Sequence, residues 1–260
     1  MLAVLLLAML GQDGPADLPQ VSDVARLTLS APKALVELDT SKLQGDPARL
    51  AWRPNGDLYV KMAQLDRWAN ERSKHYMLPI ADRAAPPVPL TPTAIDNEPA
   101  WASSYWLWKS SLFAPGVPGL QLELEVRNEI KTAVGTVRDG GYSQSRADPS
   151  RPQIESDVAS AQNVKTTTLK LKRQIVAEAV NTNLVPGVSF GWAPAPMGVL
   201  AYVDAKKRLT LIDRQGRTRQ VKGAANALLP AWSSDGTRLA FLQKKDKNKY
   251  AVMVVDVGLK

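Results

Sequence analysis

The sequence predicts an all-β protein assembled from several similar, small antiparallel sheets. Three observations support this prediction. A pattern of proline, tryptophan and a tight turn recurs along the chain, short apolar–polar alternations follow the turns, and 16 glycines and 19 prolines divide the 260 residues into short pieces. Alternation with a period of two is typical of strands, and many short strands separated by turn residues are typical of all-β proteins.

The clearest copy of the pattern lies near the C-terminal end. It reads PAWSSDGTRLAF over Pro230–Phe241, continues through a charged segment and ends in the apolar run Tyr250–Gly258. This order predicts a strand, a tight turn, a second strand, a hairpin tip and a third strand. A second copy, Phe190–Asp204, places Trp192 40 residues before Trp232. That spacing matches a repeat of about 40–45 residues with four strands.

Two further copies lie in the first half of the chain. RLAWRPNGDLYVKM, Arg49–Met62, has Trp52 before an Asn-Gly turn and an alternating strand. NEPAWASSYWLWKS, Asn97–Ser110, keeps the Pro-Ala-Trp start around Trp101 but lacks the turn, so it is a degenerate copy.

Each residue type in the pattern has a physical role. Proline is expected to end the preceding loop, because it cannot donate a hydrogen bond within a central strand. The tryptophan two residues later offers a large apolar face that can pack between neighbouring sheets. Asp235-Gly236 and Asn55-Gly56 tolerate positive φ and would let the chain reverse tightly.

The strands that follow the turns alternate large and small residues. Leu239 and Phe241 flank an alanine, as do Leu200 and Tyr202, so the two faces of each strand are expected to meet different surroundings. One such sheet alone would be marginally stable, and the copies must therefore stack to bury both faces.

The pattern at Pro230–Phe241, Pro-x-Trp-Ser-x-Asp-Gly-x-x-Leu-Ala-Phe, resembles the blade repeat of TolB-type, WD40-like β-propellers. The match weakens at Trp52, at Trp192, where Pro196-Met197-Gly198 replaces the Asp-Gly turn, and at Trp101. The resemblance covers about half the chain and implies a β-propeller or partial propeller of about four to six degenerate four-stranded blades.

The middle of the chain shows no blade pattern. Leu120–Val126 alternates as a strand, and Thr166–Asn181 suits either a hairpin or a short helix. We predict the hairpin, because it would complete a blade with inner strands from Leu120–Val134. Residues 136–157 are rich in glycine, proline, serine and charge, which indicates a flexible insertion.

The two ends of the chain carry separate expectations. Residues 1–16 resemble a signal peptide, because the apolar run MLAVLLLAML has the length of a secretory h-region and is too short to span a bilayer. A periplasmic or secreted domain over residues 17–260, with no transmembrane segment, would follow. The run lacks the usual basic n-region, so a start further upstream and a buried strand or helix are the alternatives. The last repeat offers only three strands, and the N-terminal ARLTLS or KALVELD segment could supply the fourth and remove an exposed edge.

Composition excludes several chemistries. The chain has no cysteine and a single histidine, His75, which rules out disulfides, thiol nucleophiles and multi-histidine metal sites. Gly187–Gly191 matches Gly-x-Ser-x-Gly, but no histidine follows Ser189 as that motif requires. A Ser189, His75 and Asp96 set lacks supporting motifs. We therefore assign no catalytic, cofactor-binding or metal residue and expect no enzyme and no cofactor.

Charge and aromatic clusters leave alternatives open. The net charge is +8, and the one dense basic run, Lys244–Lys249, is interpreted as a solvated hairpin tip, with a binding patch as the alternative. Tyr105, Trp106 and Trp108 are interpreted as core, with a carbohydrate or peptide platform as the alternative.

The resemblance implies a non-catalytic module that binds an envelope protein or peptide. The alternatives are a basic surface that binds anionic polymer and a propeller accessory to a separate hydrolase. Nucleic acid is not expected as a partner, and peripheral membrane contact stays open. A repeat architecture does not by itself determine function.

Overall fold

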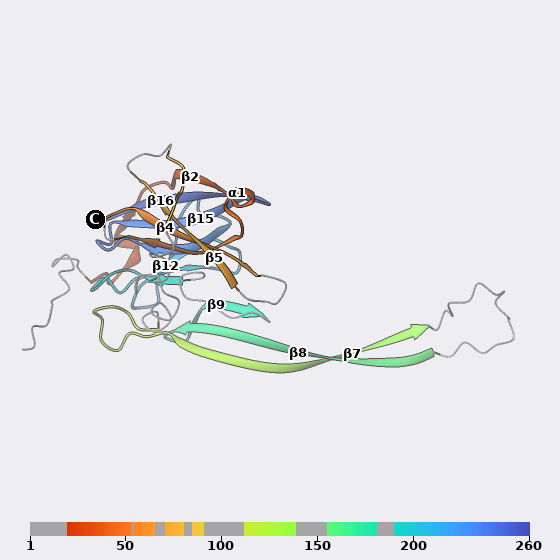
Figure 1. Cartoon of the computed structure of the whole chain (residues 1–260). Helices are drawn as coiled ribbons and strands as arrows, with labels where there is room; N and C mark the ends of the chain where they lie inside the picture. Colours follow the sequence, from red (N-terminus) through yellow and green to blue (C-terminus); the bar gives the residue numbers. More distant parts are fainter. Residues whose placement is uncertain are drawn as a thin grey trace, which may run out of the picture.

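The computed structural model describes residues 20–53, 55–65, 71–80, 85–90, 112–138, 155–180 and 190–260. These residues form four small antiparallel sheets with almost no helix (Figure 1). The predicted all-β class and the predicted small antiparallel sheets are therefore confirmed. The Trp101 copy, residues 1–16, Ser189 and Asp96 lie outside the described residues.

The first two sheets come from the first two thirds of the chain. The first sheet has the order β3-β4-β5-β6, with bounds Asp46–Trp52, Leu58–Leu65, Glu71–Leu78 and Val88–Pro89. The second sheet has the order β7-β8-β9, with bounds Glu123–Arg138, Glu155–Leu171 and Gln174–Val180.

The third and fourth sheets hold the two best copies of the sequence pattern. The third has the order β10-β11-β12-β13, with bounds Phe190–Trp192, Leu200–Val203, Leu209–Ile212 and Thr218–Gln220. The fourth contains β14, β15 and β16, with bounds Ala227–Trp232, Arg238–Asp246 and Lys249–Leu259.

The N-terminal segment completes the fourth sheet, as the sequence predicted. A 3-10 turn, η1 (Val24–Arg26), precedes β1 (Leu27–Leu29) and β2 (Lys33–Asp39). Both strands pair antiparallel with β16, β1 along its C-terminal part and β2 along its N-terminal part. Leu27 and Leu38 are buried, so the N-terminal segment both covers the edge of β16 and fills the cores beside it.

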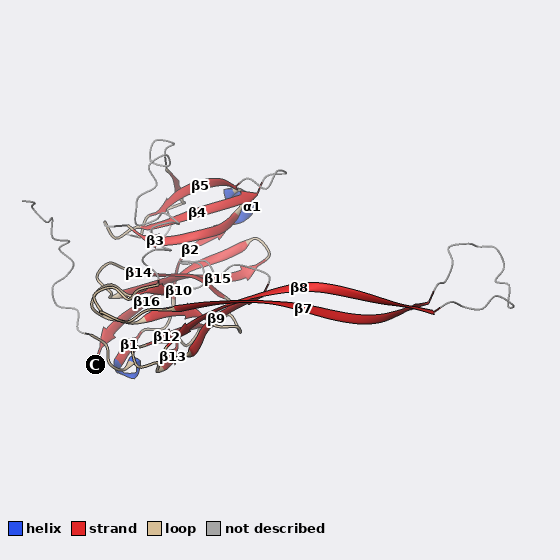
Figure 2. Ribbon diagram, turned by 90° about the horizontal axis from the view of Figure 1, so that it is seen from below, coloured by secondary structure: helices blue, strands red, loops and turns tan. Residues whose placement is uncertain are grey.

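Three hydrophobic cores join the four sheets into a stack (Figure 2). One core lies between the second and third sheets and includes Leu169 and Leu200. The next lies between the third and fourth sheets and includes Phe241. The last lies between the fourth and first sheets and includes Leu242 and Val60. The stacking order is therefore second, third, fourth, first.

The three described tryptophans occupy equivalent positions in this stack. Each pairs in register with a leucine of the next strand: Trp52 with Leu58, Trp192 with Leu200 and Trp232 with Leu239. Each tryptophan also packs in the core that its sheet shares with the preceding sheet of the stack. The predicted wedge role of tryptophan is confirmed, and its recurrence shows that the sequence copies are structural copies.

The alternation of large and small residues has the predicted consequence. In β15, Leu239 and Phe241 face the core with the third sheet, while Ala240 and Leu242 face the core with the first. Successive side chains of a strand point to opposite faces, so a strand between two cores is apolar throughout.

The predicted role of proline needs correction. Pro230 does not end a loop before the strand but lies inside β14, next to a register shift between Leu228 and Ala231. Pro47 lies in β3 in the same way, at a shift between Pro47 and Arg49. Both strands are at the edge of their sheets, where a missing N–H disrupts no ladder on the open side.

The turns after the tryptophans also differ in detail from the prediction. Gly56 and Gly236 take positive φ, 88° and 65°, but Asn55 and Asp235 do not. Instead, Asn55 Oδ1 accepts from Asp57 N at 3.2 Å, and Asp235 Oδ1 accepts from Thr237 N at 3.1 Å. The acidic or amide residue therefore stabilises the turn by its side chain, while glycine supplies the reversal.

Most of the predicted insertion at residues 136–157, namely residues 139–154, lies outside the described residues, and the second sheet shows only its two ends. Residues 136–138 continue β7 and residues 155–157 begin β8, paired in register as Thr136 with Asp157. The predicted hairpin over Thr166–Asn181 is confirmed: β8 and β9 join at Lys172 and Arg173, which both have positive φ. The segment predicted to give two inner strands gives only β7 within the described residues.

Candidate functional site

A short connection between β2 and β3 builds one wall of a polar concave site. It contains α1 (Thr40–Leu43), capped by Asp39, whose carboxylate accepts from Ser41 N at 3.0 Å and Ser41 Oγ at 2.5 Å. Gln44 and Gly45 then take positive φ and turn the chain into β3. A Cβ at Gly45 would lie 2.7 Å from the Ala63 carbonyl oxygen, so this approach requires glycine.

The connection also touches the hairpin between β15 and β16. Thr40 N donates to the Asn248 carbonyl oxygen at 2.9 Å, and Asp39 pairs in register with Lys249. The Lys244–Lys249 run therefore forms a hairpin tip, as predicted, with its turn at residues 247 and 248. This tip is held beside α1 and the first sheet.

A polar pocket of about 630 Å³ lies between these three elements. We call it the α1 pocket. Its lining is almost wholly polar or small and consists of Thr40, Ser41, Gln44, Gly45, Asp46, Ala63, Gln64 and Asn248. Hydroxyl and amide groups can both donate and accept hydrogen bonds, so the pocket suits a polar group better than an apolar one.

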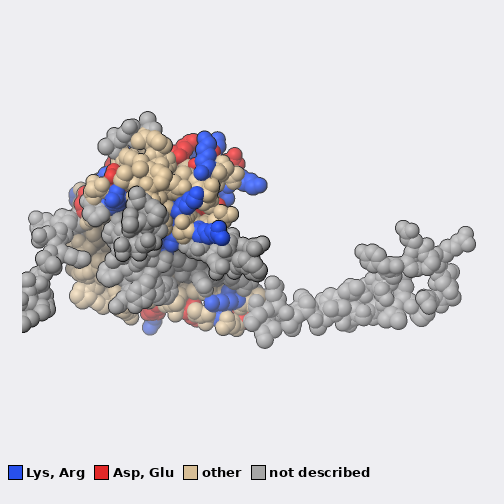
Figure 3. Space-filling view, in the orientation of Figure 1, with Lys and Arg blue, Asp and Glu red and all other residues tan. Residues whose placement is uncertain are grey.

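Exposed lysines surround the α1 pocket. We define the lysine end as Lys42, Lys74, Lys244, Lys245, Lys247 and Lys249, all of which are exposed. Lys42 follows the lining residue Ser41, Lys247 and Lys249 flank Asn248, and the Lys74 ammonium donates to Gln44 Oε1. Figure 3 shows Lys and Arg side chains gathered on this side of the molecule, with fewer acidic side chains among them.

The electrostatics of the lysine end favour negative charge. The pKa of Asp39 lies below its ordinary value, chiefly because Ser41 donates to the carboxylate and also because Lys42 and Lys249 lie near it. Among the described side chains, Asp46 in the pocket lining and Asp246 in the hairpin tip are further carboxylates at this end, and the lysines outnumber them. A negative group placed there would gain from the same positive field.

The β7–β8 hairpin is a second candidate feature. β9 pairs with β8 only from Thr166 to Leu171, so beyond Arg127 and Thr166 the hairpin has two strands. Eleven residue pairs, from Asn128–Lys165 to Arg138–Glu155, form this part, which we call the arm. At about 3.3 Å per residue it is roughly 36 Å long.

The arm leaves the stacked sheets on the side where α1 lies, in both views (Figures 1 and 2). At its base, Glu125 pairs with Arg127 and Lys170. The hydrogen bond from Lys170, followed by that from Arg127, lowers the pKa of Glu125. Leu124 and Val126, on the same strand, are 40% and 47% exposed, so apolar surface continues from the core onto the start of the arm.

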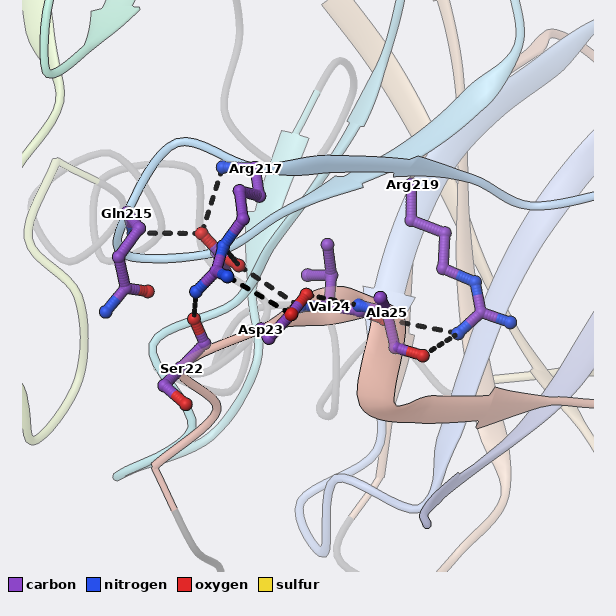
Figure 4. A network of polar contacts seen from close by, with 8 residues as sticks. Ser22, Asp23, Val24, Ala25, Gln215, Arg217 and Arg219 are labelled. Atoms are coloured by element: carbon purple, nitrogen blue, oxygen red, sulfur yellow. Dashed lines mark hydrogen bonds and ion pairs between the residues drawn. The ribbon is translucent and has the colours of Figure 1, made fainter.

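A third polar cluster is structural. Buried Asp213 accepts from Val24 N at 3.1 Å and from Arg217 N at 3.0 Å, and the Arg217 guanidinium forms ion pairs with Asp213 at 3.3 Å and with Asp23 at 3.1 Å (Figure 4). Arg219 donates to the Val24 carbonyl oxygen at 3.1 Å. These contacts join the N-terminal segment to the third sheet, and the buried Asp213 carboxylate is satisfied by them.

His75 is buried in β5, not solvated, and its Nδ1 lies 2.6 Å from the Tyr59 hydroxyl. His75 is the cross-strand neighbour of Lys61, and Lys61 is that of Arg49. These three residues lie on the face of the first sheet that points away from its core with the fourth sheet. Tyr105, Trp106 and Trp108 lie outside the described residues.

Sequence reasoning recognised the hairpin tip but not the lysine end. Lys42 and Lys74 lie far from Lys247 in sequence; the pairing of β2 with β16 brings Lys42 beside the tip, and the stacking of the fourth sheet on the first brings Lys74 there. The pairing of β2 with β16 was the available signal, because it places the segment after β2 beside the tip.

Within the described part of the chain, no group of three or more His, Asp or Glu side chains could hold a metal ion. No helix among the described residues is long and apolar enough to span a membrane. Comparisons with protein-family models, with curated proteins and with solved structures found no match to this chain.

Proposed function

We propose that this chain is a non-catalytic, propeller-like module of the cell envelope that binds a protein partner, and that the arm is part of its binding surface. The single observation that carries the proposal is the unsupported length of the arm. Eleven residue pairs extend beyond the third strand of the second sheet.

The energetics of the arm support a binding role. An isolated two-stranded hairpin is marginally stable in water, because it lacks a core. Its two strand edges present unpaired backbone groups, which invite pairing with another chain. Addition of a partner strand to such an edge is a common mode of protein recognition. A partner would thus stabilise the arm by covering what the stacked sheets leave open.

The propeller-like part of the proposal rests on the repeat. Three sheets repeat the same tryptophan–leucine pair in the same relation to the preceding sheet, which is the relation expected between neighbouring blades. The TolB-type pattern at Pro230–Phe241 and the apolar N-terminal run favour an exported protein with envelope partners. In this proposal the stacked sheets serve as a rigid support for the arm.

Truncation of the arm tests the proposal. Thr132–Ala161 would be replaced by Asn-Gly, which joins the paired residues Lys131 and Gln162 through a two-residue turn. A control variant would have only residues 139–154 replaced by Asn-Gly, which joins the paired residues Arg138 and Glu155 and keeps both strands. Each protein would be crosslinked mildly in its native envelope, and the attached proteins would be identified.

The expected result is a specific crosslinked protein with the full chain and with the control, and none with the truncated arm. If the truncated protein folds and recovers the same partner in the same yield, the arm is not part of the binding surface. Anionic polymer recovered in place of protein, and released by salt, would favour a charge-driven function instead.

A further inference from the structure

Some basic residues of the described chain are held in ion pairs, and others, including the six of the lysine end, are not. Elsewhere, Lys33 pairs with Asp256, Arg208 with Asp204 and Lys170 with Glu125. No such pair joins any of the six lysines to a carboxylate in the described ranges. Lys245 instead contacts Gln243, and Lys244 lies 5.8 Å from the centre of the Tyr250 ring. Their charge is therefore available to a ligand.

The α1 pocket adds donors at the centre of this charge. Gln64 and Asn248 carry amide groups at the pocket wall, and both are exposed. A carboxylate accepts hydrogen bonds only, and it would find these donors together with the surrounding ammonium groups. The site thus combines long-range attraction with short-range donors, which is the combination that binds acidic side chains.

We infer that the lysine end and its α1 pocket bind an acidic polypeptide segment of the protein partner. This inference rests on the proposed function and specifies the chemistry of that partner. The arm and α1 lie toward the same horizontal side in Figures 1 and 2, but the arm extends from the second sheet and α1 lies beside the first sheet, at the other end of the stack, so the acidic segment is a contact separate from that of the arm. The acidic segment lies across the pocket, with carboxylates directed at Lys42, Lys247 and Lys249.

Two other anionic ligands fit the site less well. Single-stranded nucleic acid is bound through stacking on aromatic side chains, and among the described residues the aromatic side chain beside the tip, Tyr250, is buried. A membrane surface requires apolar side chains that enter the bilayer. The large apolar residues that are exposed among those described lie on other elements and are Val88, Phe113, Leu124, Val126, Ile175 and Leu259.

The expected strength of binding follows from the exposure of the six lysines. A single exposed ion pair contributes little, commonly below about 1 kcal/mol, so no single lysine dominates. Several lysines together raise the rate of encounter with an acidic partner, and salt screens them over about 10 Å. Binding is therefore expected to be moderate, fast and sensitive to salt.

The test measures binding of a labelled poly-glutamate peptide to the full chain by fluorescence anisotropy. The first variant carries Lys42→Gln, Lys247→Gln and Lys249→Gln. Its matched control removes the same charge elsewhere, at the exposed residues Lys172, Lys222 and Lys260. Both are compared at about 50 mM and about 300 mM NaCl, and anionic phospholipid vesicles and single-stranded DNA serve as competing probes.

We expect the lysine-end variant to bind poly-glutamate about tenfold more weakly, a change of about 1.4 kcal/mol. The control should change by less than about twofold, and high salt should remove most of the difference. Equal losses in both variants would show that only net charge matters and would overturn the inference. Retained peptide binding, with vesicle or DNA binding lost instead, would also overturn it.

The arm-truncated protein separates this inference from the proposed function. It keeps the lysine end and should bind poly-glutamate as the full chain does, although it loses the crosslinked envelope partner. If the arm-truncated protein keeps its partner while the lysine-end variant loses poly-glutamate, the arm proposal fails and the acidic-segment site stands.

Discussion

At the scale of single residues, the tryptophans show how one repeated side chain acquires different partners. Trp52 is buried, and its Nε1 donates to the Ala231 carbonyl oxygen of the fourth sheet at 2.9 Å. Arg238 stacks over the same ring at 4.3 Å. The equivalent Nε1 of Trp232 is buried without a hydrogen-bond partner in the described structure. A buried donor without a partner costs free energy.

This contrast predicts different effects for one substitution. Trp52→Phe removes the hydrogen bond between the two sheets, leaves a buried carbonyl without its donor and reduces packing. We therefore expect the free energy of unfolding to fall by about 2–3 kcal/mol. Trp232→Phe removes a buried donor that has no partner, and this stabilisation offsets much of the lost packing. We therefore expect the free energy of unfolding to fall by less than about 1 kcal/mol. Urea unfolding of both variants measures the difference, and equal losses would contradict it.

Asp235 predicts a specific pH dependence. Burial raises its pKa, but hydrogen bonds from Ser233 and Thr237 outweigh burial and hold the pKa below its ordinary value near 3.8. Because the folded-state pKa is lower than the unfolded one, the ionised form stabilises the fold. This stability is present above about pH 4 and is lost as the pH falls through the folded-state pKa.

We therefore expect Asp235→Asn to be less stable than the parent protein at pH 7 and to lose less stability between about pH 4 and pH 2. Chemical unfolding across this range provides the measurement. Asp246→Asn, at the exposed hairpin tip, is the control. If the free energies of unfolding of Asp235→Asn and the parent fall in parallel as the pH is lowered, this carboxylate does not contribute to the loss of stability in acid.

At the scale of elements, the N-terminal strands belong to the cores rather than to the surface. Val24 and Leu27 lie in the core between the third and fourth sheets, and Leu38 lies in the core between the fourth and first. The sequence predicted that ARLTLS or KALVELD would complete the last repeat. Both segments do so, because β16 is eleven residues long and accommodates β1 and β2 along its edge.

Leu27→Ala should therefore lower the free energy of unfolding by about 3 kcal/mol, because it opens a cavity in a well-packed core. Thr28→Ala, on the exposed face of the same strand, should change it by less than about 0.5 kcal/mol. Deletion of residues 17–40 should abolish cooperative thermal unfolding. An unchanged melting transition after that deletion would show that the N-terminal strands do not hold the fourth sheet together.

At the scale of the whole molecule, the arm and the stack differ in how they are stabilised. Each sheet of the stack shares at least one core with a neighbour. The described core residues all lie outside Thr132–Ala161, so truncation of the arm should leave the stack intact. The molecule therefore consists of a rigid body and a projecting ribbon (Figure 1).

Small-angle X-ray scattering can check this shape. The truncated protein removes seven residue pairs of ribbon, so its maximum dimension should be at least about 20 Å shorter than that of the full chain. Its melting temperature should stay within about 2 °C. A maximum dimension that does not change would mean that the arm folds back on the sheets in solution.

The candidate site was only partly predictable. The hairpin tip at Lys244–Lys249 was predicted from a charged run between two apolar strands, because local sequence determines a hairpin. Its proximity to Lys42 and Lys74 was not, because these residues come from the first sheet and its connection. The same limit explains the arm: the alternation at Leu120–Val126 predicted a strand, but its length depends on pairing with β8, about 30 residues away.

The sequence by itself determined that this protein is all-β, that a tryptophan–turn unit repeats along it, and that its N-terminal strands complete its last sheet. These features follow from local chemistry, namely side-chain alternation, turn residues and apolar repeats. The tertiary structure alone decided the order of the stack, the place of Pro230 inside an edge strand, the arm and the lysine end. Each of these depends on contacts between residues far apart in sequence, which a local pattern does not record.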